Sequence, residues 1–158
     1  MKLKADKGKT KDEWLTPPSL LKELGEFDLD PCSPIDRPWD VAKKHYTYLD
    51  NGLMQNWVGR VYCNPPYGSH AGSWVEKCAM HGNAIALVPV RAETNWFFNY
   101  VWDRADALFF IKGRISFYHV TGESQAGTLA APTVLIAYGQ NNIEVLRNLK
   151  IKGKFIKL

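Results

Sequence analysis

The stretch VYCNPPYG, residues 61–68, decides the fold. Its first three residues are typical of a buried strand, and an asparagine and two prolines follow at once. Because proline has no backbone N–H and a fixed φ, the strand has to end there. A helical pattern follows over residues 69–81, and the almost continuous apolar run 83–90 predicts a second strand. Strand, helix and strand in this order predict a parallel pair joined by a crossover helix.

The rest of the chain extends this unit into an α/β domain. Apolar patterns predict further strands over residues 27–33, 45–49, 107–120 and 132–139. The third of these is bent, or folded into a hairpin at Gly113, and the fourth is the last strand of the chain. Helices are expected over residues 14–25, with Thr16 as N-cap, and over 94–105. We therefore expect a mostly parallel central sheet with helices on both faces and a C-terminal antiparallel strand pair.

Composition and charge suit one domain with basic ends. The chain has 158 residues, of which 46% are hydrophobic and 23% charged. The net charge of +4 is concentrated at the termini, where residues 147–158 carry five basic residues and no acid. We expect a disordered basic arm (1–12), a single domain (13–146) and a basic C-terminal segment (147–158). Basic ends favour nucleic acid as a partner, although lysine-rich termini also aid solubility.

The cysteines and the apolar runs exclude several protein classes. The three cysteines, at positions 32, 63 and 78, lack a paired short spacing, so neither a disulfide framework nor a metal is expected. No apolar run approaches the ~20 residues of a membrane span, and the N-terminus lacks the apolar middle of a signal peptide. These features predict a cytoplasmic protein. The oligomeric state is left open between a monomer and a weak dimer.

The residues after the strand at 61–63 describe a site for a planar amino group. Each proline favours an extended conformation in the residue before it, so Asn64 Oδ1 and the Pro65 carbonyl oxygen can both accept from one –NH₂ group. Two such hydrogen bonds localise the nitrogen lone pair, which makes the nitrogen reactive toward an electrophilic methyl group. The Tyr67 ring offers a stacking face for a nucleobase taken out of a duplex. Adenine, cytosine and a glutamine side chain all fit this chemistry, and a non-catalytic DNA-binding remnant is a further alternative.

The cofactor side departs from the usual pattern of methyltransferases. These enzymes carry a Gly-rich turn after the first strand, whereas this chain has DLDPCS at residues 28–33. S-adenosylmethionine is cationic at its sulfonium and ammonium groups, so the carboxylate of Asp30 at this strand end would attract it. The alternative is an aspartate that caps a turn beside Pro31.

Six blocks of sequence resemble the phage-type DNA N-6-adenine-methyltransferase (Dam) family. They are EWLTPPSLL, FDLDPCS, DNGLMQNWVGRVYCNPPYG, ALVPVRAETNWF, FIKGRISF and AAPTVLIAYG, in this order, and they span residues 13–139. The resemblance implies a Rossmann-like fold with S-adenosylmethionine as cofactor. It also implies methyl transfer to the 6-amino group of adenine at specific sites in double-stranded DNA, and a phage or prophage origin.

The resemblance carries over to individual residues. It implies a catalytic motif of Asn64, Pro65, Pro66 and Tyr67. It implies cofactor contacts from an N-terminal segment, from the strand exit that replaces the Gly-rich turn and from one further acid: Thr16, Pro17, Asp30, Pro31, Cys32 and Asp50. An Asp-Asn-Gly turn is an alternative reason for the last of these.

Loops have to recognise the DNA, because the chain has no room for a separate recognition domain. The polar segment 119–132 carries Ser124 and Gln125, and glutamine suits an adenine edge. Candidates for phosphate contacts lie on or after apolar strands: Arg91, Lys112 and Arg114. The alternative is an ordinary mobile hairpin tip.

Overall fold

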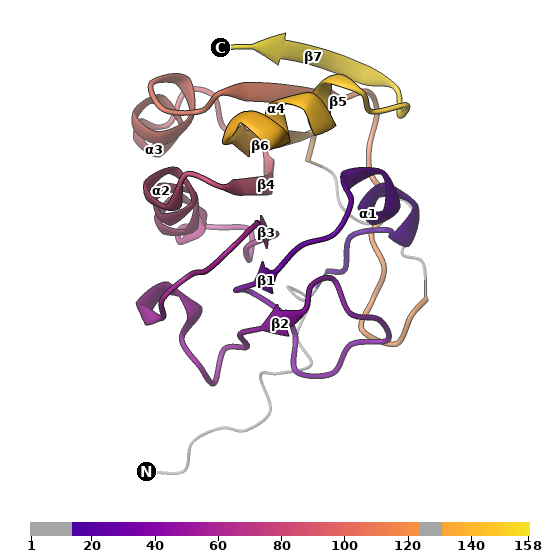
Figure 1. Cartoon of the computed structure of the whole chain (residues 1–158). Helices are drawn as coiled ribbons and strands as arrows, with labels where there is room; N and C mark the ends of the chain where they lie inside the picture. The colour runs from indigo at the N-terminus through magenta and orange to yellow at the C-terminus, as the bar shows by residue number, and fades with distance from the viewer. Residues whose placement is uncertain (1–13, 124–130) are drawn as a thin grey trace.

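A computed structural model describes residues 14–123 and 131–158 (Figure 1). The strands form one sheet: β1 (Leu29–Asp30), β2 (Lys44–His45), β3 (Val61–Cys63), β4 (Ala84–Pro89), β5 (Ala107–Ile111), β6 (Thr133–Tyr138) and β7 (Gly153–Lys157). The helices are α1 (Pro18–Leu24), α2 (Ala71–His81), α3 (Asn95–Phe97) and α4 (Gln140–Arg147). A 3₁₀ turn η1 (Gly52–Met54) and a π-helix η2 (Phe98–Trp102) complete the described elements.

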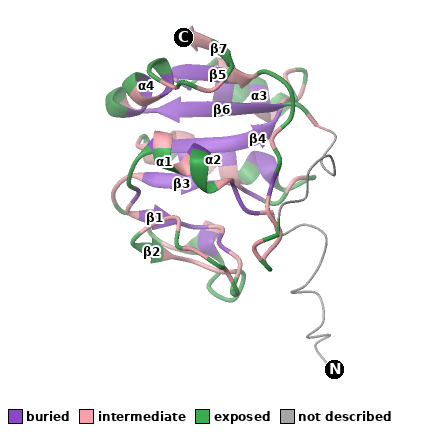
Figure 2. Ribbon diagram, turned by 90° about the vertical axis from the view of Figure 1, so that its right-hand side faces the viewer, coloured by how far each residue is buried: buried purple, intermediate pink, exposed green. Residues whose placement is uncertain are grey.

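The strand order is β2-β1-β3-β4-β6-β5-β7. The first four of these strands are parallel, and β6 pairs antiparallel with both β4 and β5, as β7 does with β5. This arrangement confirms the expected sheet with a parallel core and antiparallel C-terminal strands. It also brings the carboxyl ends of β1, β3, β4 and β5 to one edge of the sheet, where β6 and β7 begin. We call this the carboxyl edge, and the β4 arrow in Figure 2 points toward it.

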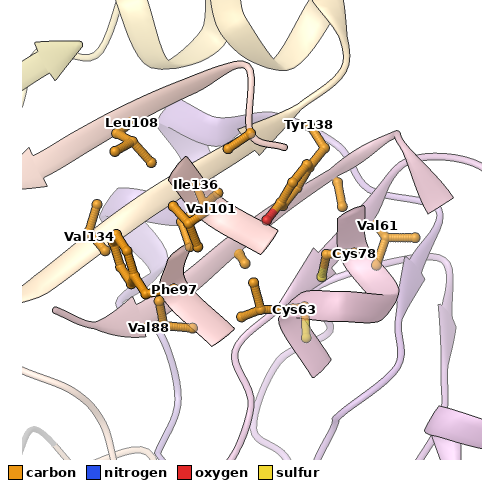
Figure 3. Close-up of a cluster of buried hydrophobic side chains, with 14 of the residues drawn as sticks. Val61, Cys63, Cys78, Val88, Phe97, Val101, Leu108, Val134, Ile136 and Tyr138 are labelled. Carbon is orange, nitrogen blue, oxygen red and sulfur yellow. The ribbon is translucent and has the colours of Figure 1, made fainter. Parts of the chain in front are cut away.

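Two hydrophobic layers enclose the sheet. Strands β4 and β6 are buried along their whole lengths, as a strand with packed elements on both faces should be (Figure 2). One layer packs α2 and η2 on the sheet and contains Cys78, Phe97 and Val101 (Figure 3). The other contains residues of α1 and α4. No helix of the described residues is long and apolar enough to cross a membrane.

Helix α1 does not begin as the sequence predicts. Thr16 is not its N-cap, because the cap position is Pro17 and the helix starts at Pro18. The two prolines lack backbone N–H groups, so the first turn has fewer donors to cap. The Thr16 side chain instead forms a short hydrogen bond with the Tyr62 hydroxyl, inside the core. Gly25 ends the helix as predicted.

Three predicted elements are shorter than expected. Strand β2 covers only the start of the 45–49 prediction, because a turn closed by the Asp50 N–H and the Thr47 carbonyl follows it. Strand β5 ends at Ile111, so the 107–120 segment is neither one long strand nor a hairpin. The helix predicted over 94–105 is one α-turn that continues as the π-helix.

Two elements near the C-terminus were not predicted. Helix α4 covers residues for which no helix was expected. The prediction that residues 132–139 hold the last strand is wrong, because β7 follows them. Strand β7 is lysine-rich and lies at the outer edge of the sheet, with Phe155 opposite Phe109. An edge strand with one solvated side needs few apolar residues, so its composition resembles that of a polar tail.

Arg60, just before β3, holds several chain ends together. Its Nη1 and Nη2 donate to the carbonyls of Glu26 and Leu24, each at 2.8 Å, and its Nε donates to Asn142 Oδ1 at 2.7 Å. Its guanidinium also lies 4.2 Å from the centre of the Phe27 ring. One side chain therefore connects α1, the entry to β1 and α4.

We predict that Arg60→Lys lowers the free energy of unfolding by about 2–3 kcal/mol, because the three donors of an ammonium group share one nitrogen and cannot reach three acceptors spaced around a planar guanidinium. Urea denaturation followed by circular dichroism measures the change. Arg104→Lys, at an exposed position, is the matched control and should change stability by less than about 0.5 kcal/mol. Equal midpoints for the two variants would contradict the role of Arg60.

Candidate active site

The side chain of Asn64 has a defined orientation at the exit of β3. Its Nδ2 donates to the carbonyl oxygen of Trp14 at 2.9 Å. Because only the amino end of an amide can donate, Oδ1 must point the other way. Among the described residues, no hydrogen bond uses Asn64 Oδ1 or the Pro65 carbonyl oxygen. Both oxygens that the sequence predicts as acceptors are thus without a donor in the described part of the chain, although Pro65 itself is buried.

Residues 14–16 form a strap across this strand exit. The backbones of Leu15 and Tyr118 exchange two hydrogen bonds, at 2.8 and 2.9 Å. Next to them, Thr16 is 2% exposed and bonds to Tyr62 of β3. The position of the Trp14 carbonyl, and with it that of the Asn64 amide, is thus determined by contacts on both sides.

A cavity of about 260 Å³ opens beside Asn64 at the carboxyl edge. We call it the β1–β3 cavity. It contains four residues predicted from the sequence: Pro31, Cys32, Asn64 and Pro66. It also contains residues that the sequence reasoning missed, among them Trp14, Ser33, Thr47, Tyr48, Asn51 and Trp74. The aromatic rings among these could not be distinguished from core residues by sequence pattern alone.

Gly52 explains how the wall of this cavity forms without a Gly-rich turn. A Cβ atom at this position would lie 2.1 Å from the Pro31 carbonyl oxygen and 3.2 Å from the Trp74 ring. Only glycine allows the turn after β2 to approach the exit of β1 so closely. The required glycine is present, but it belongs to the turn after the neighbouring strand. The sequence signal was the Asp-Asn-Gly triplet at 50–52, where Asn51 has a left-handed φ of 53°.

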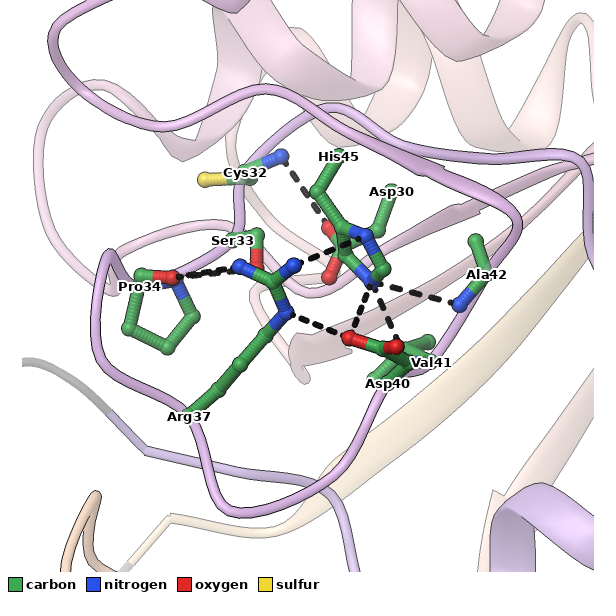
Figure 4. Close-up of polar contacts among 9 residues, drawn as sticks. All are labelled: Asp30, Cys32, Ser33, Pro34, Arg37, Asp40, Val41, Ala42 and His45. Carbon is green, nitrogen blue, oxygen red and sulfur yellow. Dashed lines mark hydrogen bonds and ion pairs between the residues drawn. The ribbon is translucent and has the colours of Figure 1, made fainter.

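Asp30 is a buried carboxylate at the end of β1. Its side chain is 6% exposed, and its Oδ1 accepts from the Cys32 N–H at 3.1 Å (Figure 4). Burial raises the pKa of Asp30 to about 7, and the Cys32 N–H and the Arg37 charge only partly offset this effect. The structure thus contains the turn-capping contact that was the alternative to cofactor binding. A carboxylate that only caps a turn does not need to be buried. Burial makes the charged form of Asp30 unfavourable, so the capping contact alone does not explain its buried position.

His45 closes the loop beside Asp30. Its Nε2 lies 3.2 Å from the Val41 N and 3.4 Å from the Ala42 N, and its Nδ1 lies 3.2 Å from Arg37 Nη2 (Figure 4). Burial and the Arg37 charge lower the pKa of His45, which favours the neutral imidazole. A neutral imidazole has one acceptor nitrogen, so either Nε2 accepts from the backbone N–H groups or Nδ1 accepts from Arg37, and protonation of the ring removes that acceptor.

Four predicted cofactor residues do not line the β1–β3 cavity: Thr16, Pro17, Asp30 and Asp50. Asp30 directly precedes Pro31, which does line it. Thr16 and Pro17 follow shortly after Trp14 in the chain, and Trp14 is the residue of that segment that lines the cavity. The Asp50 carboxylate turns back on its own loop and accepts from the Thr47 N–H at 2.8 Å. The turn-forming alternative for Asp50 accounts for this geometry.

Tyr67 faces a second cavity, between the exits of β3 and β4. This β3–β4 cavity has a volume of about 360 Å³. The Tyr67 ring meets Phe117 edge-on, with 6.1 Å between ring centres. Among the described residues its hydroxyl has no hydrogen-bond partner although it is buried, and burial raises the pKa of Tyr67. The wall opposite Tyr67 includes Trp96, which packs so closely on Gly72 of α2 that a Cβ there would lie 2.8 Å away.

The candidate phosphate contacts lie at the same edge of the sheet. Arg91 is exposed and lines the β3–β4 cavity, and Lys112 and Arg114 are exposed after the end of β5. Ser124 and Gln125, the predicted base contacts, lie outside the described residues. The chain leaves the sheet after β5 and re-enters it as β6 at Thr133, which pairs with Pro89 at the carboxyl edge.

A family comparison identifies the chain. The family model for DNA N-6-adenine-methyltransferase (Dam) matches residues 4–146. The chain belongs to the Dam family. Neither the curated proteins nor the solved structures contain a significant match.

Membership of the Dam family selects among the activities that the sequence left open. The protein is an adenine-specific DNA N6-methyltransferase that uses S-adenosylmethionine, and its substrate is DNA. Cytosine and glutamine as methyl acceptors, and a non-catalytic DNA-binding role, are no longer needed as alternatives. The residues around the β1–β3 cavity fit this cofactor, since they combine aromatic rings, a close-approach glycine and a nearby buried carboxylate.

We predict that Asp30→Asn stabilises this Dam-family protein at neutral and alkaline pH. Folding raises the Asp30 pKa from 3.8 to about 7, so the folded state binds the proton more tightly and the free energy of unfolding falls as pH rises between these values. Asparagine keeps the acceptor for the Cys32 N–H but carries no charge. At about pH 8 the variant should therefore be more stable by about 2–4 kcal/mol, and it should gain nothing near pH 4.

Thermal and urea unfolding across this pH range tests the prediction. Asp50→Asn, which neutralises an exposed carboxylate, is the matched control and should not make the protein more stable at about pH 8. If Asp30→Asn unfolds with the same pH dependence as the wild type, the carboxylate does not carry the titration assigned to it.

Proposed function

We propose that the protein binds S-adenosylmethionine in the β1–β3 cavity and methylates an adenine flipped out of double-stranded DNA at Asn64. The observation that carries this proposal is the hydrogen bond from Asn64 Nδ2 to the Trp14 carbonyl at 2.9 Å. That bond directs Oδ1 away from the strap as an acceptor. An adenine 6-amino group has two N–H donors, one for Oδ1 and one for the Pro65 carbonyl oxygen.

The two acceptors would activate the adenine nitrogen without removing a proton first. S-adenosylmethionine supplies a methyl group made electrophilic by the sulfonium. With both N–H bonds directed at Asn64 and Pro65, the N6 lone pair would be localised on nitrogen and able to attack the methyl group. The N6–carbon bond would form as the carbon–sulfur bond breaks, with the electron pair left on sulfur. The surplus proton then leaves N6 for solvent, since neither acceptor is a strong base.

The β3–β4 cavity would receive the adenine ring. Tyr67 provides a stacking face, and its buried hydroxyl is available to a polar base edge. Trp96 provides a second aromatic wall that its contact with Gly72 holds in place. Phosphate contacts by Arg91, Lys112 and Arg114 would hold the duplex at the carboxyl edge, and the loop with Ser124 and Gln125 would read bases.

The cofactor ammonium would lie near Asp30. A cation there favours the ionised carboxylate and offsets part of its burial cost, so we expect cofactor binding to release a proton near neutral pH. Thr16 and Pro17 would contribute by holding Trp14 at the cavity. The order of the sequence blocks, which is like that of phage-type members, supports a phage or prophage origin and action in the cytoplasm of a bacterial host.

We predict that Asn64→Ala lowers the rate of methyl transfer at saturating DNA and cofactor by about 10²–10⁴-fold, because the variant has lost the side-chain acceptor. Its dissociation constant for S-adenosylmethionine should stay within about threefold of the wild-type value, since Asn64 is only one part of the cavity wall. Transfer of labelled methyl groups to unmethylated duplex DNA measures the rate, and calorimetry measures binding.

Asn64→Asp is the matched control for this experiment. Aspartate keeps an acceptor oxygen but places a second oxygen against the Trp14 carbonyl, so it should retain more activity than alanine and less than asparagine. Unchanged turnover in Asn64→Ala would contradict the acceptor role.

A further inference from the structure

The outer corner of the sheet carries a group of exposed cations. Strand β7 pairs with β5 so that Lys154 lies opposite Phe110, near the carboxyl edge. The Lys112 N–H donates to the Lys152 carbonyl at 2.9 Å, which brings the exit of β5 and the entry to β7 together. We call the four exposed residues here the β5–β7 corner: Lys112, Arg114, Lys152 and Lys154.

This corner is not neutralised within the described structure. Among residues 14–123 and 131–158, none of the four cations forms an ion pair. The neighbouring Lys150 differs, because its backbone N–H donates to the Glu23 carboxylate at 2.8 Å and so places an acid beside it. Because all four side chains are exposed, water and salt screen their mutual repulsion, and the corner presents a positive potential to an anionic partner.

The distance from Asn64 to the corner can be counted in strands. Four steps separate β3 from β7, through β4, β6 and β5. At about 4.8 Å per strand this gives roughly 19 Å. Along B-DNA, with about 3.4 Å per base pair, that distance corresponds to five or six base pairs. Figure 1 shows β7 at the opposite end of the sheet from β1 and β2.

We propose that the β5–β7 corner binds phosphates of the DNA duplex about five or six base pairs from the target adenine, on one side only. The inference rests on the proposed placement of the adenine at Asn64. Strand β7 lies outside residues 4–146, which the family model matches, whereas Lys112 and Arg114 lie within them. The occupant is duplex DNA because the corner is continuous with the edge where β3 and β4 end.

The test compares two double variants of equal charge. Lys152→Gln with Lys154→Gln removes two charges from the corner. Arg104→Gln with Lys157→Gln removes two exposed charges from the opposite edge, where Lys157 pairs with Ala107. The site that the enzyme methylates is first mapped by sequencing. Binding is then measured with a duplex that extends about ten base pairs beyond the target on both sides, and with duplexes that are cut to about three base pairs on one side or on the other.

For the long duplex, the corner variant should lower the slope of log affinity against log salt by about 2 and weaken binding at about 100 mM salt roughly tenfold. On the duplex cut at the β7 side, the variant and the wild type should bind equally. Turnover at saturating DNA should stay within about twofold of the wild-type value. The opposite-edge variant should match the wild type on every duplex.

Two results would overturn the inference: an unchanged salt slope in the corner variant, or an equal loss in the opposite-edge variant. Either can occur in an enzyme that still methylates adenine, so neither touches the proposed function. The proposed function fails separately if the wild-type protein labels no duplex DNA. Equal melting temperatures for both variants and the wild type will show that the folded state is intact.

Discussion

Strand β3 ends at Cys63, and the rest of the site depends on that end. The two prolines that follow cannot donate to a ladder, so the chain leaves the sheet there while the neighbouring strand β4 continues. Strand β4 runs three residues past its pairing with β3. Neither Asn64 Oδ1 nor the Pro65 carbonyl oxygen accepts a hydrogen bond from a described donor. Two acceptor oxygens without a described donor therefore lie at the exit of β3. The strands beside this exit are well packed, because β4 and β6 are buried along their whole lengths.

The cofactor side reaches a similar result by a different route. A Gly-rich turn after β1 would let a ligand approach the backbone, but Pro31 and Cys32 occupy that place. The close approach occurs instead between Gly52 and the Pro31 carbonyl. The cavity wall is therefore built by two turns packed together, and Asp30, the acid directly before Pro31, is buried rather than solvated. A buried carboxylate that titrates near neutrality is suited to a cationic ligand, because the ligand supplies the countercharge that the protein lacks.

The sequence predicted the central strands, α2 and the exit motif because each carries a strong local signal: continuous apolar runs, helical spacing, or prolines at a fixed place. It could not predict the partner of Asn64, since a backbone carbonyl at Trp14 carries no residue-type signal. Thr16 was misread as a cap because its contact with Tyr62 is 46 residues distant in the chain. Strand β7 was missed because pairing at an outer edge leaves half of its side chains in solvent. The predicted base contacts at 124 and 125 stay predictions.

The strap at residues 14–16 joins these parts into one unit. Trp14 lines the β1–β3 cavity with its side chain and orients Asn64 with its carbonyl. Leu15 exchanges hydrogen bonds with Tyr118, which precedes the segment that leads to residues 124 and 125, and the Trp14 ring meets His119 edge-on at 6.4 Å. A shift of the strap would therefore alter the cavity wall, the direction of the Asn64 amide and the entry to that segment together. The acceptor geometry at Asn64 is thus a property of the N-terminal segment as much as of the motif in which Asn64 lies.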